Sequence, residues 1–335
     1  MKGDGMIDRN MWIHTENTYP YRNLAMEEYM TIHVPEGTCI LFLWQNRHTV
    51  VIGRNQNCWS ECKVNFLEEE GGYLVRRLSG GGAVFHDLGN LNFTFIVKKK
   101  DYDVSKQLDV ILEAVRSLGL KAEKTGRNDI TVDGRKFSGN AFYHSGDCCY
   151  HHGTVLLNAD KEYMSRYLNV PKEKLASKGV SSVKARVANL CEFCPDLTVG
   201  RMKEALVGAF SRVYGLEAER MYESSLPEDE IGTMTGKFES WEWKYGRKIP
   251  FEYEMGRRFF WGGIQMQFHV DEGKIREVNV FSDAMEQEMI GDLAVCLKGC
   301  PYDEAAVCGG MEKVGRAHGE GAKISDIITL VKECM

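Results

Sequence analysis

The chain has few of the features that mark exported, membrane-spanning or nucleic-acid-binding proteins. No apolar run in its 335 residues approaches the roughly 18–20 residues that span a bilayer. The first residues, MKGDGMIDRNMWIHTEN, have neither the apolar core of a signal peptide nor the Arg-rich character of a transit peptide. A formal net charge of −6 argues against the broad basic surface of a non-specific nucleic-acid binder. We therefore expect a cytoplasmic protein of metabolic type.

Internal repeats and low-complexity tracts are also absent from the sequence. With 43% hydrophobic and 27% charged residues, the composition is that of an ordinary globular protein. A length of 335 residues suits one large domain followed by a small one.

Cysteine is plentiful, with eleven residues, but the second Cys-x-x-Cys pair that a zinc ribbon requires is missing. Cys191 and Cys194, in CEFC, have the spacing of a metal or redox pair, and Cys296, Cys300 and Cys308 form a loose cluster near the end. A metal site and incidental thiols are the two interpretations. Without an export signal, we expect reduced thiols.

The hydrophobic pattern predicts more strands than crossover helices in the first half of the chain. Amphipathic spacing predicts helices over 21–34, with Asn23 as the candidate cap, over 103–120, and around 161–168 and 202–214. Short β-branched or aromatic runs indicate strands, the first two joined as a hairpin, at 39–44, 49–53, 73–78, 82–86, 91–97, 129–139 and 151–157. This balance predicts an α+β domain with a mixed or antiparallel sheet.

The texture changes from about Trp241. The segment WEWKYGRKIP is aromatic and basic and ends in proline, which is typical of a linker or a domain edge. Beyond it, the sequence indicates one antiparallel pair of strands around DEGK and two helices. We predict a small α+β domain from about residue 250 to the end.

Three consecutive glycines stand in RRLSGGGAVFH, between an arginine pair and a histidine. No lysine follows them as in a P-loop, and no acidic residue is placed as in a dinucleotide fingerprint. Backbone N–H groups without a Cβ can still form an anion-binding nest, to which Arg76 or Arg77 would add charge-assisted hydrogen bonds. The alternative is a tight turn beside a solvated arginine pair.

A second stretch, GRNDITVDGRKFSGNA, contains an Asp-Gly turn that predicts a hairpin. Lys136 offers a compact cation beside small residues, and Asn128 and Asp129 offer oxygen ligands for Mg²⁺. A surface lysine and a plain turn are the alternatives. In YHHGTVLL, adjacent strand residues face opposite sides, so at most one of His151 and His152 points inward, and an exposed or structurally bonded imidazole is the commoner case for either.

Taken together, these stretches resemble one family, the lipoate–protein ligases of the A type. The motifs RRLSGGGAVFHDLGN, GRNDITVDGRKFSG, HHGTVLLNAD and KGVSSVKARVANL match those of the family in order and at similar separations. The segments LFLW, VVIGRNQN and WEWKYG fit as well, so the resemblance runs over almost the whole chain.

The resemblance implies a fold and a reaction. The expected fold is the α+β fold of biotin and lipoate ligases, similar to class II aminoacyl-tRNA synthetases, with a catalytic domain over residues 1–245 and a small α+β accessory domain over 250–335. The expected reaction has two steps: ATP and Mg²⁺ convert lipoate to lipoyl-AMP, and a lysine of an apo lipoyl domain then takes the lipoyl group. The implied acceptors are 2-oxoacid dehydrogenase E2 subunits and the glycine-cleavage H protein, and we expect a monomer.

The resemblance also implies roles for individual residues. Lys136 matches the lysine that contacts the α-phosphate and the lipoyl carbonyl oxygen, and it is the expected catalytic residue. The positions expected to bind ATP or the adenylate are Arg77, Gly82, Ala83, Val84, Phe85, Asn90, Asn128, Asp129 and Lys136, with Asp129 as the expected Mg²⁺ contact. The positions expected to bind lipoate are Leu24, Trp44, Arg77, Ser79, Gly81, His86, Lys136 and His152.

Several alternatives stay open at this point. A lipoyltransferase that takes a preformed adenylate would keep the same pocket, and a non-catalytic lipoate or nucleotide sensor would bind without turnover. A biotin ligase is a further alternative. Cys148 and Cys149 precede HHG, and a related octanoyltransferase class uses a cysteine, although ligase chemistry requires no thiol.

Overall fold

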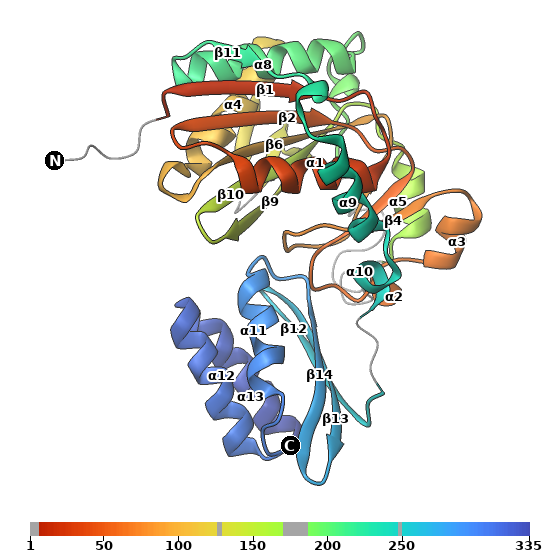
Figure 1. Cartoon of the computed structure of the whole chain (residues 1–335). Coiled ribbons are helices and arrows are strands. Elements are labelled where there is room, and N and C mark those ends of the chain that lie inside the picture. The colour runs from red at the N-terminus through yellow and green to blue at the C-terminus, as the bar shows by residue number, and fades with distance from the viewer. Residues whose placement is uncertain (1–6, 126–128, 170–186, 247–249) are drawn as a thin grey trace, which may run out of the picture. The chain divides into compact units, whose positions relative to one another are not determined.

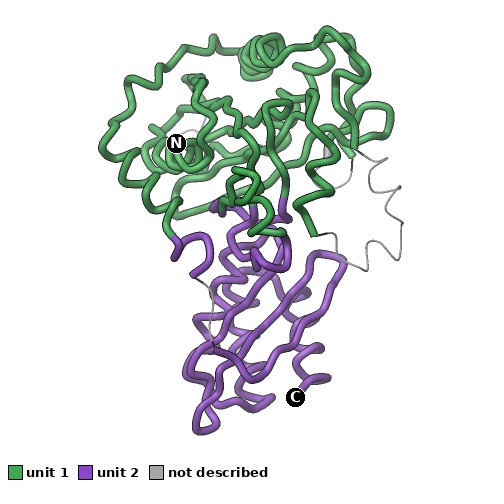
Figure 2. The backbone as a smooth tube through the Cα atoms, turned by 90° about the vertical axis from the view of Figure 1, so that its right-hand side faces the viewer, with its two compact units in different colours: residues 1–51, 63–75, 84–240 green, residues 52–62, 76–83, 241–335 purple. Residues whose placement is uncertain are grey.

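The computed structural model describes residues 7–125, 129–169, 187–246 and 250–335 (Figure 1). It divides into two compact units, each discontinuous in sequence (Figure 2). Unit 1 comprises residues 1–51, 63–75 and 84–240, and unit 2 comprises residues 52–62, 76–83 and 241–335. Within these described ranges, no helix combines the length and the apolar character needed to cross a membrane.

Eight strands form the main sheet of unit 1, in the order β11-β1-β2-β6-β10-β9-β8-β7. The strands are β1 (Arg9–His14), β2 (Thr38–Trp44), β6 (Asn90–Lys98), β7 (Ala122–Thr125), β8 (Asp129–Val132), β9 (Arg135–Ser145), β10 (Cys148–Leu156) and β11 (Ala218–Arg220). Strand β1 pairs in parallel with β2 and β11, while the other neighbours are antiparallel. The mixed α+β sheet predicted from the sequence is confirmed.

Helices cover both faces of this sheet. On one face, α4 (Val104–Ser117) and α8 (Val199–Tyr214) pack against an apolar core built on the alternate β6 residues Leu91, Phe93 and Phe95. On the other face lies α1 (Pro20–His33), followed outward by α9 (Glu228–Glu239), as Figure 1 shows. Successive strand residues face opposite sides, so Asn90, Asn92 and Thr94 point to the α1 face together with the apolar Ile96.

A second, three-stranded sheet has the order β4-β3-β5. It consists of β3 (Thr49–Ile52), β4 (Tyr73–Arg76) and β5 (Val84–His86), with α3 (Val64–Glu69) and α5 (Lys161–Tyr167) nearby in unit 1. The expected hairpin between 39–44 and 49–53 is wrong, since β2 pairs with β1 and β6 while β3 belongs to this other sheet. Both strands are fully buried apolar runs, and such runs do not specify their partners.

Helix α1 begins at Pro20, one residue before the predicted range, and its N-cap is Tyr19, four residues before the candidate cap Asn23. Pro20 stands in its first turn, where a missing N–H costs nothing, so Asn23 is not the cap. The Asn23 amide instead donates to the carbonyls of Asn17 (3.2 Å) and Gln45 (2.8 Å) and to Asn46 Oδ1 (3.0 Å). The short 3₁₀ turns of unit 1 are η1 (Lys99–Asp101), η2 (Leu190–Glu192) and η3 (Glu223–Ser225).

Unit 2 contains an antiparallel sheet in the order β12-β13-β14, packed against three helices. Its elements are α2 (Cys58–Glu61), α10 (Trp241–Tyr245), β12 (Tyr253–Phe259), β13 (Gly262–Asp271), β14 (Lys274–Ser282), α11 (Gln287–Leu297), α12 (Glu304–His318) and α13 (Gly321–Cys334). The sequence predicted only two of these strands and two of these helices after residue 250. Strand β12 was missed because most of its residues are exposed, and α12 because two adjacent glycines interrupt its pattern.

Gly153, at the centre of the main sheet, has no room for a side chain. A Cβ there would lie 2.6 Å from the Gly139 carbonyl oxygen, 2.6 Å from Phe93 Cζ and 2.8 Å from Asn140 Oδ1. We expect Gly153→Ala to lower the free energy of unfolding by about 1–3 kcal/mol, since backbone must shift to admit the methyl group. Urea denaturation measures the change.

Gly232, in α9, provides the matched control. A Cβ at Gly232 meets nothing within 4 Å, and its backbone is helical. Gly232→Ala should therefore raise the free energy of unfolding by about 0.5–1 kcal/mol, because alanine loses less backbone entropy than glycine. Equal effects of the two substitutions would contradict the packing argument.

His151 lies on the α4 side of the sheet and is fully buried. Its Nδ1 is 3.2 Å from Gln107 Oε1 and its Nε2 is 2.8 Å from Asn140 Oδ1. Burial, with smaller contributions from His152 and Lys124, lowers the pKa of His151 to about 3. The first histidine of HHG is therefore a neutral structural residue of the core.

This burial predicts a pH dependence of stability. Between pH 6.5, the ordinary histidine pKa, and about pH 3, His151 is protonated in the unfolded chain but neutral in the folded protein. Stability is therefore intact above pH 6.5 and is lost as the pH falls, by about 1.4 kcal/mol per unit for this group alone. Denaturation between pH 4 and 8 should show a flatter profile for His151→Gln than for the wild type. His33→Gln, at an exposed position, should leave the slope unchanged; equal slopes for His151→Gln and wild type would refute the assignment.

Candidate active site

A buried polar group lies between α1 and the main sheet. The indole Nε1 of Trp44 donates to Thr94 Oγ1 (3.1 Å), and the Thr94 hydroxyl donates to Glu27 Oε1 (2.7 Å). His152 Nδ1 lies 2.9 Å from the same Glu27 oxygen. All four side chains are at least nine-tenths buried. This contact leaves His152 Nε2 on the side of the ring away from Glu27.

The predicted lipoate-side residues of unit 1 gather around this group. Leu24 lies one turn before Glu27 on α1 and is buried. The rings of Trp44 and His86 meet edge to face with centroids 6.4 Å apart. Asn46 Nδ2 donates to His86 Nδ1 (3.3 Å) and thereby joins the imidazole to the loop that Asn23 braces. Apolar walls with a few fixed polar atoms are what a small ligand pocket requires.

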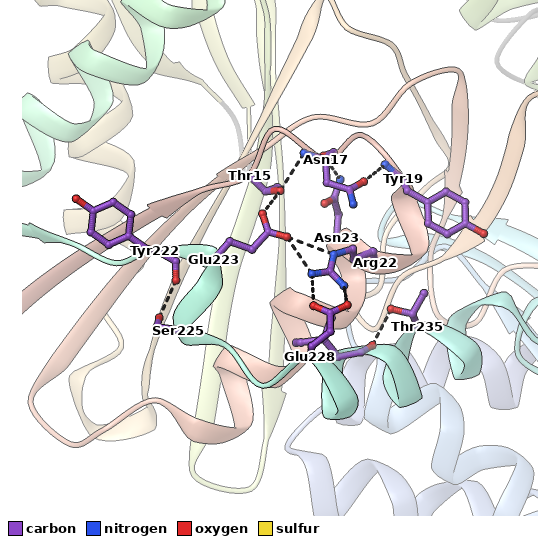
Figure 3. Close-up of polar contacts among 11 residues, drawn as sticks. Thr15, Asn17, Tyr19, Arg22, Asn23, Tyr222, Glu223, Ser225, Glu228 and Thr235 are labelled. Carbon is purple, nitrogen blue, oxygen red and sulfur yellow. Dashed lines mark hydrogen bonds and ion pairs between the residues drawn. The ribbon is translucent and has the colours of Figure 1, made fainter.

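A charged cluster fixes the start of α1 (Figure 3). The Arg22 guanidinium makes two bonds to the Glu228 carboxylate, of 2.7 and 2.8 Å, and two to Glu223, of 3.0 and 3.3 Å. Glu223 also accepts from the Thr15 hydroxyl (2.7 Å). Further along α1, Glu28 receives two hydrogen bonds from Lys237 of α9, of 2.5 and 2.6 Å. These contacts hold the helix that carries Leu24 and Glu27.

Lys136 stands at the start of β9, directly after the Asp-Gly turn. Asp133 and Gly134 both have positive φ, of 49° and 71°, which confirms the predicted hairpin turn. The Lys136 side chain is half-buried and crosses Gly139, since a Cβ on Gly139 would lie 3.3 Å from Lys136 Nζ. Gly139 N–H donates to Thr154 Oγ1 (3.3 Å), so the ammonium group lies near β10.

The segment after residue 186 anchors the backbone of Lys136. Ala188 N–H donates to the Lys136 carbonyl (2.8 Å), and Val187 bridges to Lys136. Glu192 accepts from Lys161, from the Asn189 N–H and from Arg135. Although burial opposes it, this set of donors lowers the pKa of Glu192 to about 2. The end of the KGVSSVKARVANL motif thus supports β9; its first part lies outside the described residues.

Asn90 and Asn92 belong to the polar face of β6 and lie near the start of the strand. Asn90 Nδ2 donates to Asn92 Oδ1 (2.9 Å), and both residues are almost completely buried. Asn92 pairs across the sheet with Trp44 on one side and with Thr154 on the other. Asn90, predicted to lie near the adenylate, is thus two residues from the Trp44 pair.

The glycine loop belongs to unit 2, where Arg77 bonds to the loop itself and Arg76 to other backbone segments of the same unit. Arg77 is 5% exposed and donates to Ser79 Oγ (2.9 Å) and to the carbonyls of Gly80 (2.7 Å) and Gly82 (2.9 Å). Arg76 is also buried and bonds to backbone carbonyls, including those of Gln56 (2.6 Å) and Lys244 (2.7 Å). The alternative of a solvated arginine pair is wrong, because both side chains are buried.

Glycine is required in this loop because backbone approaches closely. A Cβ on Gly80 would lie 2.4 Å from the Ala284 carbonyl oxygen, and one on Gly53 would lie 2.2 Å from that of Gly81. Gly81 has a φ of +90°, and its N–H donates to the Ala284 carbonyl (3.2 Å). Gly82 is the exception: it is exposed, and a Cβ added there would meet nothing within 4 Å.

The remaining predicted residues, Val84 and Phe85, differ in how deeply they are buried. Val84 is half-buried at the start of β5, after Ala83. Phe85 is 2% exposed and packs among His48, Tyr163 and Tyr167. Phe85 thus contributes to packing in unit 1.

The expected Mg²⁺ ligands are Asn128 and Asp129. Asn128 lies outside the described residues, and Asp129 is described as a backbone partner of Gly139. In the described part of the chain, no group of three or more His, Cys, Asp or Glu residues is placed to hold a metal ion. No disulfide joins any of the cysteines in the described ranges.

Sequence reasoning missed Glu27, Thr94, Asn92 and Glu192. Glu27 stands in a helix that is buried on several sides, so the periodicity of α1 does not single out one carboxylate. Asn92 and Thr94 do carry a signal, because polar residues alternate with Leu91, Phe93 and Phe95 in a strand that is buried on both faces.

Comparison with protein families and known proteins shows what the chain as a whole is similar to. The model of the lipoyl protein ligase A/B catalytic domain matches residues 19–211, and that of the bacterial lipoate protein ligase C-terminus matches residues 248–331. Lipoate-protein ligase A of Psychrobacter cryohalolentis is 40% identical over 319 residues, which is 92% of this chain and 94% of that protein.

Solved structures are similar as well. The crystal structure of LipL1 of P. falciparum in complex with lipoate has a TM-score of 0.82 at 29% identity and covers 96% of this chain and 99% of its own. A bipartite lipoate protein ligase from Thermoplasma acidophilum, studied with its E2 lipoyl domain, has a TM-score of 0.63 at 25% identity, covering 72% of this chain and 98% of its own. From its sequence, fold and relatives, the chain belongs to the lipoate–protein ligase family.

Proposed function

We propose that this lipoate–protein ligase uses Lys136 to stabilise the charge that develops when lipoate is activated by ATP. The observation that carries the proposal is the half-buried Lys136 side chain lying across Gly139. Lys136 lies on β9, and the neighbouring strand β10 carries His152 of the buried group of Trp44, Thr94, Glu27 and His152. A cation beside an apolar slot suits an acyl chain with an anionic end.

The chemistry explains why such a cation is needed. A carboxylate is a poor acyl donor, because its leaving group would be oxide. In the first step a lipoate carboxylate oxygen bonds to the α-phosphorus of ATP, and pyrophosphate leaves. In the second step an acceptor lysine amine bonds to the carbonyl carbon, and AMP leaves while the amine loses a proton. Both steps place negative charge at the junction of carboxyl and phosphate, where fixed cations give the largest rate gain.

The proposed lipoyl slot is formed by the residues that surround Glu27 in unit 1: Leu24, Trp44, His86 and His152. Ser79 and Gly81 remain proposed lipoate contacts from the glycine loop. For the nucleotide, the proposed contacts are Arg77, Gly82, Ala83, Val84, Phe85, Asn90, Asn128, Asp129 and Lys136. Because Arg77 is bonded to Ser79 and to loop carbonyls, its proposed role includes holding the loop in shape.

Mg²⁺ fits this proposal as a partner of the nucleotide. Mg²⁺ usually keeps several waters and takes one or two carboxylates plus substrate phosphates, so a full protein cage is not required. We assign Asp129 as its protein contact; the ion would neutralise phosphate charge during activation.

The acceptor and the domain division are parts of the same proposal. The T. acidophilum ligase was studied with its E2 lipoyl domain, which supports an apo E2 lipoyl domain of a 2-oxoacid dehydrogenase as acceptor; the H protein is proposed from the family resemblance alone. A catalytic domain over 1–245 and an accessory domain over 250–335 agree with the two family matches, 19–211 and 248–331. Monomeric state and cytoplasmic location stay predictions.

The decisive experiment incubates the protein with ATP, Mg²⁺, lipoate and an apo lipoyl domain, and reads the acceptor by intact mass. A gain of one lipoyl group that depends on ATP, with release of pyrophosphate, is expected. Modification from added lipoyl-AMP without pyrophosphate release in the ATP reaction would identify a transferase instead.

Replacing Lys136 tests the central assignment. Lys136→Met should lower ATP- and lipoate-dependent pyrophosphate release by about 100- to 1,000-fold, because a preorganised charge at the reacting oxygens is lost. Lys124→Met, at an exposed lysine of β7, should keep wild-type activity. Retention of activity by Lys136→Met with an intact fold would overturn the assignment.

The position of the Lys136 ammonium is tested through Gly139. A Cβ on Gly139 would press on Lys136 Cε and Nζ, both at 3.3 Å, and the flexible end of the lysine must move. Gly139→Ala should lower kcat a few-fold, and the bulkier Gly139→Val by up to about 100-fold, because a misplacement of about 1 Å is that costly. A Gly139→Val enzyme with wild-type kcat and the same thermal midpoint would show that the Lys136 geometry is unimportant.

A further inference from the structure

The asparagine pair of β6 leaves two hydrogen-bonding atoms unused. Asn90 Nδ2 donates to Asn92 Oδ1, while Asn90 Oδ1 and Asn92 Nδ2 have no partner among the described residues. Asn90 is 0% and Asn92 2% exposed. Reversing both amides would still leave one spare donor and one spare acceptor, with the donor then on Asn90; the hydrogen-bond assignment here places the donor on Asn92.

Two unpaired amide atoms are costly inside a protein. An unsatisfied buried donor or acceptor costs about 1–3 kcal/mol, and an apolar pair of similar size would avoid the loss. The Thr94 hydroxyl, two residues further along the same face, is satisfied, since it bonds both Trp44 and Glu27. The spare donor therefore points to a ligand.

The strand register places the pair in line with Lys136. Asn92 lies opposite Thr154 of β10, and the Thr154 hydroxyl accepts from the N–H of Gly139, which the Lys136 side chain crosses. Adjacent strands are about 4.8 Å apart, so Asn92 and Gly139 lie about 10 Å apart on either side of Thr154. Thr154 and Gly139 are half-exposed, unlike the asparagines.

A carboxylate is the group that fits this row. It presents two acceptor oxygens about 2.2 Å apart, and hydrogen bonds to charged oxygens are about 2.7–2.9 Å long. One oxygen above Thr154 can face the Lys136 ammonium while the other faces the spare amide N–H of the pair. The next row of the same face, with Thr94 and His152, leads into the buried group around Glu27.

We infer that the Asn90–Asn92 pair binds the carboxylate of the acyl substrate from the side opposite Lys136, with Asn92 as the donor. This inference rests on the proposed function. The pair then orients the carboxylate for attack on the α-phosphorus, and its spare acceptor meets a hydroxyl or N–H of the same complex.

The test compares two ligands and three variants. Binding of lipoate, and of the alcohol in which CH₂OH replaces its carboxylate, is measured by calorimetry for wild type, Asn92→Leu and Asn92→Asp. Asn10→Leu is the matched control, because Asn10 is a buried asparagine of β1 whose amide bonds to the Leu216 carbonyl.

Asn92→Leu should weaken lipoate binding about 10- to 100-fold, the value of a hydrogen bond to a charged group, and change alcohol binding less than about 3-fold. Asn92→Asp should weaken lipoate binding more strongly, because its carboxylate repels that of lipoate, while it still binds the alcohol. This variant also tests the inference if Asn92→Leu fails to fold. Asn10→Leu should leave the ratio of the two affinities unchanged.

Equal losses for both ligands in the Asn92 variants, or wild-type affinity for lipoate, would overturn the inference. Pyrophosphate release by the wild type is measured in parallel. Wild-type protein that binds lipoate but releases no pyrophosphate would refute the proposed ligase activity and leave the carboxylate contact standing.

Discussion

The two faces of the main sheet lie in different environments, and a single strand has to carry side chains suited to each. Strand β6 is buried along nearly its whole length, yet Leu91, Phe93 and Phe95 enter an apolar core while Asn90, Asn92 and Thr94 face α1. An apolar face alone would pack more simply, since a buried polar group costs free energy unless it is bonded. The polar residues of β6 distinguish the face of the sheet that carries the candidate site from the face that carries the apolar core.

Helix α1 is adapted to this polar face. Its Glu27 carboxylate takes the hydrogen bonds of Thr94 and His152, so the helix cannot slide along the sheet without leaving these groups unpaired. Arg22 and Glu28 attach the same helix to the segment that ends in α9. Residues more than 190 positions apart in the chain thus fix the walls of one small region.

The sequence predicted local structure better than long-range pairing. Periodicity located α1, α4, α5 and α8, and the Asp-Gly turn located the hairpin of Lys136, because these signals act within a few residues. The partners of β3 and the existence of β12 and α12 were not predictable from such signals: β3 is apolar without alternation, and β12 is mostly exposed. For the site, ordered motifs led to Lys136 and His152, while Glu27 and Asn92 required knowledge of which strands and helices face each other.

Unit 2 is assembled from chain segments far apart in sequence. The glycine loop at 76–83 takes its packing partners from Ala284 and its neighbours, about 200 residues later in the chain. During synthesis the loop must therefore wait for nearly the whole polypeptide before it can adopt this arrangement, and closing so long a loop carries an entropic cost that local contacts cannot offset early. A fragment beginning at residue 241 would lack this loop, and the Ala284 carbonyl would lose the hydrogen bond that it accepts from the Gly81 N–H.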